Sequence, residues 1–252
     1  MENRAAFAKA LRTELDRWQA AGRVARLWWR DDDATGPHRA LDQLFDLSTS
    51  FQAPLALAVI PLNVSPGDWL RGPVTVVQHG VAHVNHAPRG KGLGAWELGP
   101  HRSPATVLSE VADGLARLND QFGDRLLKVM VPPWNRIDLA LLPGLKEQGF
   151  LGLSAEGENE SREPLPGFLR HDGHVDPLRW KGAARFGGWE KVGGCLLERL
   201  ARIEPDQVTG LVTHHREMDK AAWVFVETLL EITRDHPAAR WEHPEILFGG
   251  AP

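Results

Sequence analysis

The stretch VARLWWRDDD, Val24 to Asp33, joins a β-forming apolar run to three consecutive carboxylates. The run up to Arg30 predicts a buried strand. The Thr-Gly-Pro sequence that follows the carboxylates predicts a break, and a helical pattern then continues to Leu47. A strand that ends in reactive side chains and is followed by a helix is the repeating unit of parallel α/β folds.

The same unit recurs along the chain. Seven strands are predicted, at residues 24–30, 55–60, 74–78, 126–131, 149–154, 168–175 and 210–214. Helical spacing is found at residues 3–20, after Ser103-Pro104, and at 139–148, 193–203 and 221–234. About seven strands favour a closed or nearly closed barrel over an open sheet. We expect one domain over residues 1–252, with helix 3–20 packed on the barrel.

Composition excludes several classes of function. The net charge is -4 and the isoelectric point is about 6.3, so we expect neither a nucleic-acid nor a membrane partner. One cysteine, Cys195, allows no disulfide within the chain. No run approaches 18 apolar residues and the N-terminus carries charges throughout, which predicts a cytoplasmic protein without a signal peptide or membrane span. Oligomeric state is not indicated.

Polar clusters follow the predicted strands in four places, at residues 31–33, 79–86, 132–136 and 214–215. The carboxyl ends of barrel strands form one face, where α/β barrels carry their active sites. The sequence therefore predicts that these four clusters meet.

His79 and His83 are the first candidates for a metal site. If the chain turns helically after the strand, their i, i+4 spacing puts both imidazoles on one face. Two imidazoles and one carboxylate suit a catalytic Zn²⁺, and a second carboxylate beside them could accept a proton from water. The alternatives are a loop with solvated histidines and, for the aspartates, a solvated turn or helix cap.

His214 and His215 follow another predicted strand. A histidine in that position can protonate a leaving group as general acid. A structural histidine bonded to a neighbouring carbonyl is an equally good interpretation.

In this order the motifs resemble the polysaccharide deacetylase family, the NodB-homology carbohydrate esterases. The matches are Asp32-Asp33, His79-Gly-Val-Ala-His83, Pro132-Pro133-Trp134, Leu211 with His214, and, more loosely, Asp176 with Trp180. They run from about Arg26 to His215, which is most of the chain.

The resemblance implies an α/β fold, a distorted (β/α)7 TIM-like barrel, and a set of roles. Asp33, His79 and His83 would bind a divalent metal, with zinc favoured. Asp32 would be the general base and His214 the general acid. The substrate-binding candidates are Pro133, Trp134, Arg136, Trp96, Arg102, Asp176, Trp180 and His215. Asp31 with Asp32 is the alternative pair; we favour Asp32 with Asp33 because the chemistry should lie beyond the strand end.

Two departures from the family pattern stand out. The family has an arginine just before its Pro-Pro motif, where it orients the base, but this chain reads KVMVPPW there. We hypothesise that Arg136 or Arg102 takes that role. The missing export signal favours a soluble acetylated substrate over a cell-wall polymer.

The expected activity is therefore metal-dependent hydrolysis of acetyl groups, N-acetyl above all, from a saccharide. A related amidohydrolase that acts on a small non-sugar amide is the first alternative. A non-catalytic carbohydrate-binding barrel, supported by the missing arginine, is the second.

Overall fold

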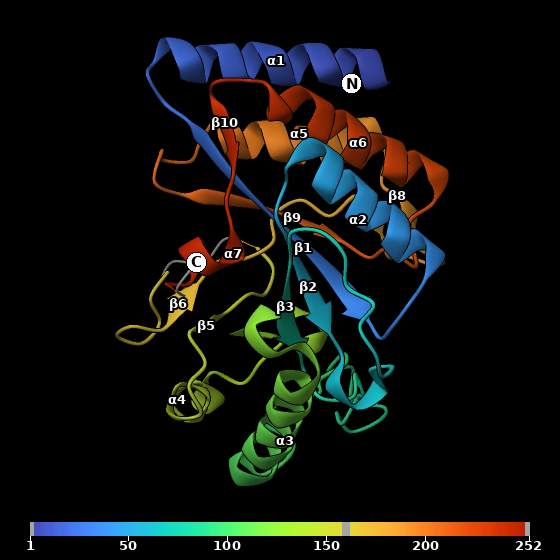
Figure 1. Ribbon diagram of the computed structural model, residues 1–252, viewed down its shortest axis with the longest axis vertical. Helices are drawn as coiled ribbons and strands as arrows, with labels where there is room; N and C mark the ends of the chain where they lie inside the picture. Colours follow the sequence, from blue (N-terminus) through green and yellow to red (C-terminus); the bar gives the residue numbers. More distant parts are fainter. Residues whose placement is uncertain (1–2, 158–161, 250–252) are drawn as a thin grey trace.

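A curled sheet of parallel strands forms the centre of the molecule (Figure 1). The computed structural model describes residues 3–157 and 162–249. The sheet's strands are β1 (Ala25–Ala34), β2 (Leu55–Val59), β3 (Val74–His79), β4 (Leu126–Val131), β5 (Gly152–Leu153), β6 (Leu169–Arg170), β9 (Val208–Thr213) and β10 (Ala239–Trp241). Along it the order is β10-β1-β2-β3-β4-β5-β6, and β9 pairs with β1.

The chain after β6 brings the two ends of the curl together. Gly173 forms a parallel bridge with Glu156, just beyond β5, and Val175 forms one with Leu211 of β9. The N–H of Val175 donates to the Gly210 carbonyl at 3.0 Å, and Val212 donates back at 2.9 Å. The predicted distorted α/β barrel is confirmed. The three-residue strand β10 and the antiparallel hairpin of β7 (Leu178–Arg179) and β8 (Arg185–Phe186) were not predicted.

Helices cover the outside of the sheet. They are α1 (Arg4–Ala20), α2 (Arg39–Phe51), α3 (Pro104–Phe122), α4 (Leu142–Glu147), α5 (Trp189–Leu200), α6 (Lys220–Arg234) and α7 (Pro244–Leu247), with short 3₁₀ turns η1 (Pro61–Asn63), η2 (Gly123–Arg125), η3 (Pro133–Asn135) and η4 (Leu139–Leu141). Ser103 caps α3 through its hydroxyl, as the Ser-Pro signal predicts. Helix α1 lies across α5 and α6 rather than on the sheet (Figure 1).

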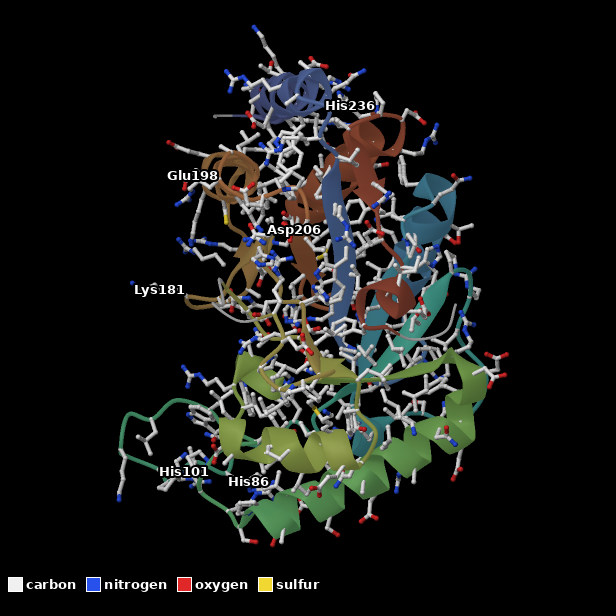
Figure 2. The ribbon with its side chains drawn as sticks, turned by 90° about the vertical axis from the view of Figure 1, so that its left-hand side faces the viewer. His86, His101, Lys181, Glu198, Asp206 and His236 are labelled. Atoms are coloured by element: carbon white, nitrogen blue, oxygen red, sulfur yellow. The ribbon has the colours of Figure 1, made fainter. Side chains whose placement is uncertain are left out.

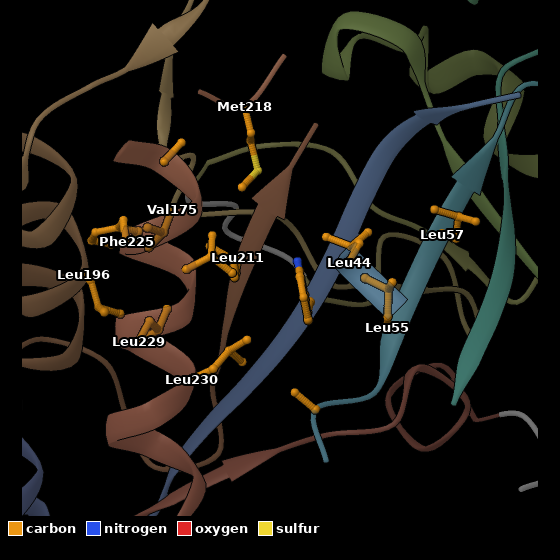
Figure 3. Close-up of a cluster of buried hydrophobic side chains, with 14 of the residues drawn as sticks. Leu44, Leu55, Leu57, Val175, Leu196, Leu211, Met218, Phe225, Leu229 and Leu230 are labelled. Carbon is orange, nitrogen blue, oxygen red and sulfur yellow. The ribbon is translucent and has the colours of Figure 1, made fainter. Parts of the chain in front are cut away.

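The alternation of side chains along β1 separates two of the hydrophobic clusters of the core. Trp28 points into the barrel, where it packs with apolar residues of β2, β3 and β4 and edge-on against Phe248. Trp29 points outward to the helices. In that outer core Leu211 of β9 faces Phe225 and Leu229 of α6 (Figure 3). Each fully buried side chain of this kind contributes about 1.5–3 kcal/mol.

None of the described helices is both long enough and apolar enough to cross a bilayer.

Candidate active site

The three aspartates belong to β1 itself. The strand continues to Ala34, so the prediction that it ends at Arg30 was wrong. Side chains alternate along a strand, and Asp31 therefore points to the outer side. It accepts hydrogen bonds from the Thr213 hydroxyl at 2.7 Å and the His215 N–H at 3.0 Å, and pairs with the His215 ring. Asp31 is fully buried in this structural contact.

Asp33 lies where the strand becomes irregular. Its φ is 67°, and the register between β1 and β2 shifts between Asp31 and Ala34. The distortion turns the carboxylate toward two imidazoles: Oδ1 lies 3.0 Å from Nε2 of His79 and 3.3 Å from Nε2 of His83. The favoured pair, Asp32 with Asp33, thus faces the histidines, and Asp31 does not.

The two histidines are brought together by a loop and not by the predicted helical turn. His79 is the last residue of β3, and its Nδ1 lies 2.9 Å from the Val131 carbonyl of β4. That bond places one proton on Nδ1, and Nε2 donates a second to Asp33. Gly80 and His83 both have left-handed backbones, with φ of 54° and 57°.

Glu97 fixes this loop. Its buried carboxylate accepts the backbone N–H groups of Val81, Ala82 and Val84 at 2.8–3.2 Å. A Cβ on Gly80 would lie 2.1 Å from Oε2 of Glu97, so the position needs glycine for space as well as for its φ. The long glycine-rich segment at 87–102, with His86 and His101 at its two ends (Figure 2), therefore supplies the group that holds His83 in place.

The donor atoms of Asp33, His79 and His83 lie within 4.8 Å of one another, close enough to hold one ion. Burial alone would raise the pKa of Asp33, but the hydrogen bond and the charge of His79 lower it well below its ordinary range. Burial lowers the pKa of His83. Burial alone would lower the pKa of His79, but the hydrogen bond to Asp33 and the charges of Asp32 and Asp33 raise it. A divalent ion would take the place of the His79 proton between the same carboxylate and imidazoles, so these residues fit one.

Asp32 is held by an arginine that its own strand supplies. Arg30 lies two residues earlier and is therefore on the same inner face. Its Nε contacts Asp32 Oδ1 at 2.8 Å, and its Nη2 donates to Oδ2 at 3.0 Å. The guanidinium also donates to the Ser154 hydroxyl and carbonyl and to the Ala155 carbonyl, at 2.6–3.0 Å. Both Arg30 and Asp32 are buried.

Neither arginine proposed from the sequence does this. Arg102 pairs with Glu110 at 2.7 Å, and Arg136 donates to the Leu93 carbonyl and lies over the Trp96 ring. The hypothesis that one of them orients Asp32 was wrong because a nearer guanidinium already occupies the carboxylate.

The Pro-Pro turn after β4 adds two strained residues. Trp134 and Asn135 both have left-handed backbones, with φ of 53° and 57°. This bend places the Trp134 ring 4.4 Å from the ring of His83 and lets Asn135 Oδ1 accept from Arg30 at 2.8 Å. Such a conformation costs about 1–3 kcal/mol per residue and is concentrated at functional sites. Of five described non-glycine residues with positive φ, four line this cavity: Asp33, His83, Trp134 and Asn135.

The remaining wall comes from His214, which directly follows the β1 neighbour β9, and from the β7–β8 hairpin. Nε2 of His214 lies 3.9 Å from Oδ2 of Asp32 on the neighbouring strand. The Trp180 ring stands edge-on to His214 at 4.6 Å, and its Nε1 donates to Asp176 at 2.7 Å. Burial raises the pKa of Asp176, although the charge of His214 opposes that change.

These walls enclose a cavity of about 290 Å³. The predicted residues that line it are Asp32, Asp33, His79, His83, Trp134, Asp176, Trp180 and His214. The predicted residues outside it are Pro133, Arg136, Trp96, Arg102 and His215. Pro133 is the buried first residue of the turn, and His215 is buried against Asp31, which explains why neither can face a substrate directly.

The sequence analysis missed three residues of the site. Arg30 had a usable signal, since the two-residue period of a strand puts it beside Asp32. Asn135 directly follows the matched turn, so its position alone indicated it. Glu156 also lines the cavity but comes from an irregular loop, and no pattern in the sequence marked it.

Solved structures with the same fold are polysaccharide deacetylases and carbohydrate esterases. A candidate polysaccharide deacetylase from Mycobacterium smegmatis matches with a TM-score of 0.62 and 12% identity, over 90% of both chains. A family 4 acetyl xylan esterase from Clostridium thermocellum was solved with a cobalt ion. It matches with a TM-score of 0.54 and 10% identity, over 89% of this chain and 90% of that one.

A CE4 esterase from Streptococcus mutans matches with a TM-score of 0.53 and 15% identity, over 86% of this chain and 83% of that one. At such identities the likeness establishes the fold. Searches with the sequence matched no family model and no curated protein.

Proposed function

We propose that the chain is a metal-dependent deacetylase of the polysaccharide deacetylase family, which removes acetyl groups, N-acetyl above all, from a saccharide. One observation carries the proposal: a carboxylate held by arginine, an Asp-His-His donor set and a histidine share one cavity. The similar solved proteins that are named for this activity support it. Residues 1–252 would act as one domain, and a cytoplasmic location remains a prediction.

Asp33, His79 and His83 would hold the ion, with zinc favoured by two imidazoles and one carboxylate. A divalent ion there supplies positive charge that eases deprotonation of water and stabilises the negative charge that develops on the acetyl oxygen. Val131 and Glu97 keep the two imidazoles in place through His79 Nδ1 and the loop backbone.

Asp32 would take the proton from the attacking water. The carboxylate is buried, and Arg30 holds both of its oxygens, so it keeps one orientation toward the cavity. The presence of Arg30 removes the main reason for the non-catalytic interpretation, which was the missing arginine before the Pro-Pro turn.

His214 would give a proton to the departing amine at Nε2, the nitrogen that lies nearest Asp32. An amine leaves poorly as its anion, so cleavage of an amide needs such an acid. Asp32 and His214 line the same cavity 3.9 Å apart, so a base and an acid would both be within reach of one acetyl group.

Two exposed tryptophans favour a saccharide over a small non-sugar amide. Trp134 and Trp180 are 37% and 49% exposed and stand on opposite walls of the cavity. Aromatic faces at a wet surface suit the apolar faces of sugar rings.

The test is release of acetate from N-acetylglucosamine oligomers by zinc-loaded protein, with Asp32→Asn and His214→Ala as controls. We expect activity in the native chain and a loss of about 10²–10⁴-fold in each variant, with the metal retained. If the metal-loaded native protein cleaves a simple aryl acetamide and no acetylated sugar, the small-amide alternative replaces this one. Loss of metal from His214→Ala would make that histidine a ligand.

A further inference from the structure

We propose that a second, cationic cavity beside the candidate active site binds an anionic group of the acetylated sugar, either a carboxylate or a phosphate. This inference rests on the proposed function, whose substrate it narrows. The second cavity has a volume of about 380 Å³ and shares Glu156, Asp176 and Trp180 with the first. The two spaces therefore meet along one border.

Three cationic side chains line only the second cavity. Arg179 ends β7, Lys181 lies in the turn that joins β7 to β8, and Lys191 is in the first turn of α5. Lys181 projects outward from the edge of the molecule (Figure 2). Within residues 3–157 and 162–249, none of the three forms an ion pair, and the buried Nε of Arg179 has no hydrogen-bond partner.

The acidic residues at the border do not cancel these charges. Asp176 uses both carboxylate oxygens, accepting from the Leu178 N–H and the Trp180 indole at 2.7 Å each. Its burial also raises its pKa, which disfavours the charged form. Glu156 is exposed to solvent and lies beside Asn135, on the side of the first cavity. Arg179, Lys181 and Lys191 are thus the charged residues of the second cavity that have donors available for a ligand.

The start of α5 adds to the positive field. Its N-cap is Gly188, which provides no side chain to accept the first backbone N–H groups. The N-terminus of a helix carries a partial positive charge and favours anions. Of the two charged residues in this turn, Lys191 lines the second cavity, and the exposed Glu190 does not.

Trp180 sets the geometry of the substrate. Its ring touches His214 in the first cavity, and its neighbours in sequence, Arg179 and Lys181, line the second. A sugar ring on Trp180 would present its acetyl group to Asp32 and His214, and a substituent on its other side would reach the cations. A neutral sugar would form no ion pair with those cationic side chains, which would stay hydrated.

The experiment compares three acetylated substrates at low ionic strength: neutral N-acetylglucosamine trisaccharide, N-acetylmuramic acid with its carboxylate, and N-acetylglucosamine 6-phosphate. Acetate release gives kcat and KM for native protein, for Arg179→Gln/Lys191→Gln, and for the control Lys9→Gln/Arg12→Gln, which removes two exposed charges from α1.

We expect the subsite variant to lose about tenfold or more in kcat/KM for at least one anionic substrate, mainly through KM, and to stay within about twofold on the neutral sugar. The control should match native protein on all three, and added salt should reduce the native preference. The substrate that loses more identifies the anion as carboxylate or phosphate. Equal losses on charged and neutral sugars, or no loss, would overturn the proposal.

Binding separates this inference from the proposed function. If native protein releases no acetate from any sugar, calorimetry with N-acetylmuramic acid and with N-acetylglucosamine 6-phosphate still tests the cavity. Binding to native protein that weakens about tenfold in Arg179→Gln/Lys191→Gln, and not in the control, supports an anion site without deacetylation. Equal affinity of native protein and Arg179→Gln/Lys191→Gln, or no binding to native protein, refutes the anion site.

Discussion

The two walls of the cavity are built differently. On one wall Arg30, Asp32, Asp33 and His79 are part of long, buried strands and are connected by hydrogen bonds and ion pairs. The other wall, with Asp176 and Trp180, rests on two-residue strands, and Trp180 is half exposed. The first wall is suited to chemistry that needs fixed geometry, and the second to recognition of a variable substrate.

The largest effect should come from the rigid wall. Asp32→Asn keeps the shape of the side chain but removes the proton acceptor, so we expect kcat to fall by about 10²–10⁴-fold with the metal retained. Asp31→Asn, one residue earlier in the same strand, is the matched control. It weakens the buried contact with His215 and should cost about 3 kcal/mol of stability, measured by urea unfolding, with much less effect on kcat. The reverse pattern would make Asp31 with Asp32 the functional pair.

Arg30→Lys tests whether the fixed orientation of Asp32 matters. Lysine keeps the charge but cannot bond Asp32, Asn135 and Ser154 together as the planar guanidinium does. We expect kcat to fall by about 10–10²-fold, since small errors in orientation are costly, while KM and metal content stay unchanged. The control Arg136→Lys should retain activity. An active Arg30→Lys enzyme would reduce Arg30 to a structural residue.

Trp180→Ala examines the exposed wall. Loss of the stacking surface should raise KM about tenfold, equivalent to about 1.4 kcal/mol of binding, and leave stability and metal content nearly unchanged. Trp180→Phe keeps an aromatic face and should recover most of the affinity. If Trp180→Ala lowers kcat alone, the ring acts on His214 and not on the sugar.

The last prediction concerns stability at acid pH behind the exposed wall, with no expected effect on activity at neutral pH. Burial, aided by the charge of Arg199, lowers the pKa of His174 to about 3, and its Nδ1 accepts the Gly210 N–H at 2.9 Å. Below about pH 6.5 His174 is protonated in the unfolded chain but not in the native state. The free energy of unfolding therefore decreases as the pH is lowered, by about 2 kcal/mol between neutral pH and pH 5.

His174→Asn keeps an acceptor and removes the titration. Its free energy of unfolding in the metal-free protein should therefore depend less on pH by that amount, whereas the exposed control His243→Asn should follow native protein. Identical pH profiles for all three proteins would show that the pKa of His174 is the same in the native and unfolded states.

The contrast between the walls also explains what the sequence could predict. Long strands have clear apolar runs, and the polar residues at their ends indicated where Asp32, His79 and His214 would meet. Arg30 was missed because the strand was expected to end there, although a two-residue period would have placed it beside Asp32. Glu97 and Glu156 act from irregular loops, and the β7–β8 strands are too short to show a period. Such contacts depend on tertiary packing.

The most direct test of the account is the metal content of the protein. Native chain and His83→Ala would be loaded with zinc, dialysed together and analysed for metal per chain, with His86→Ala as a matched control from the same loop. The account predicts about one ion in native protein and in His86→Ala, and little or none in His83→Ala. A correctly folded native protein that binds no divalent ion would contradict it.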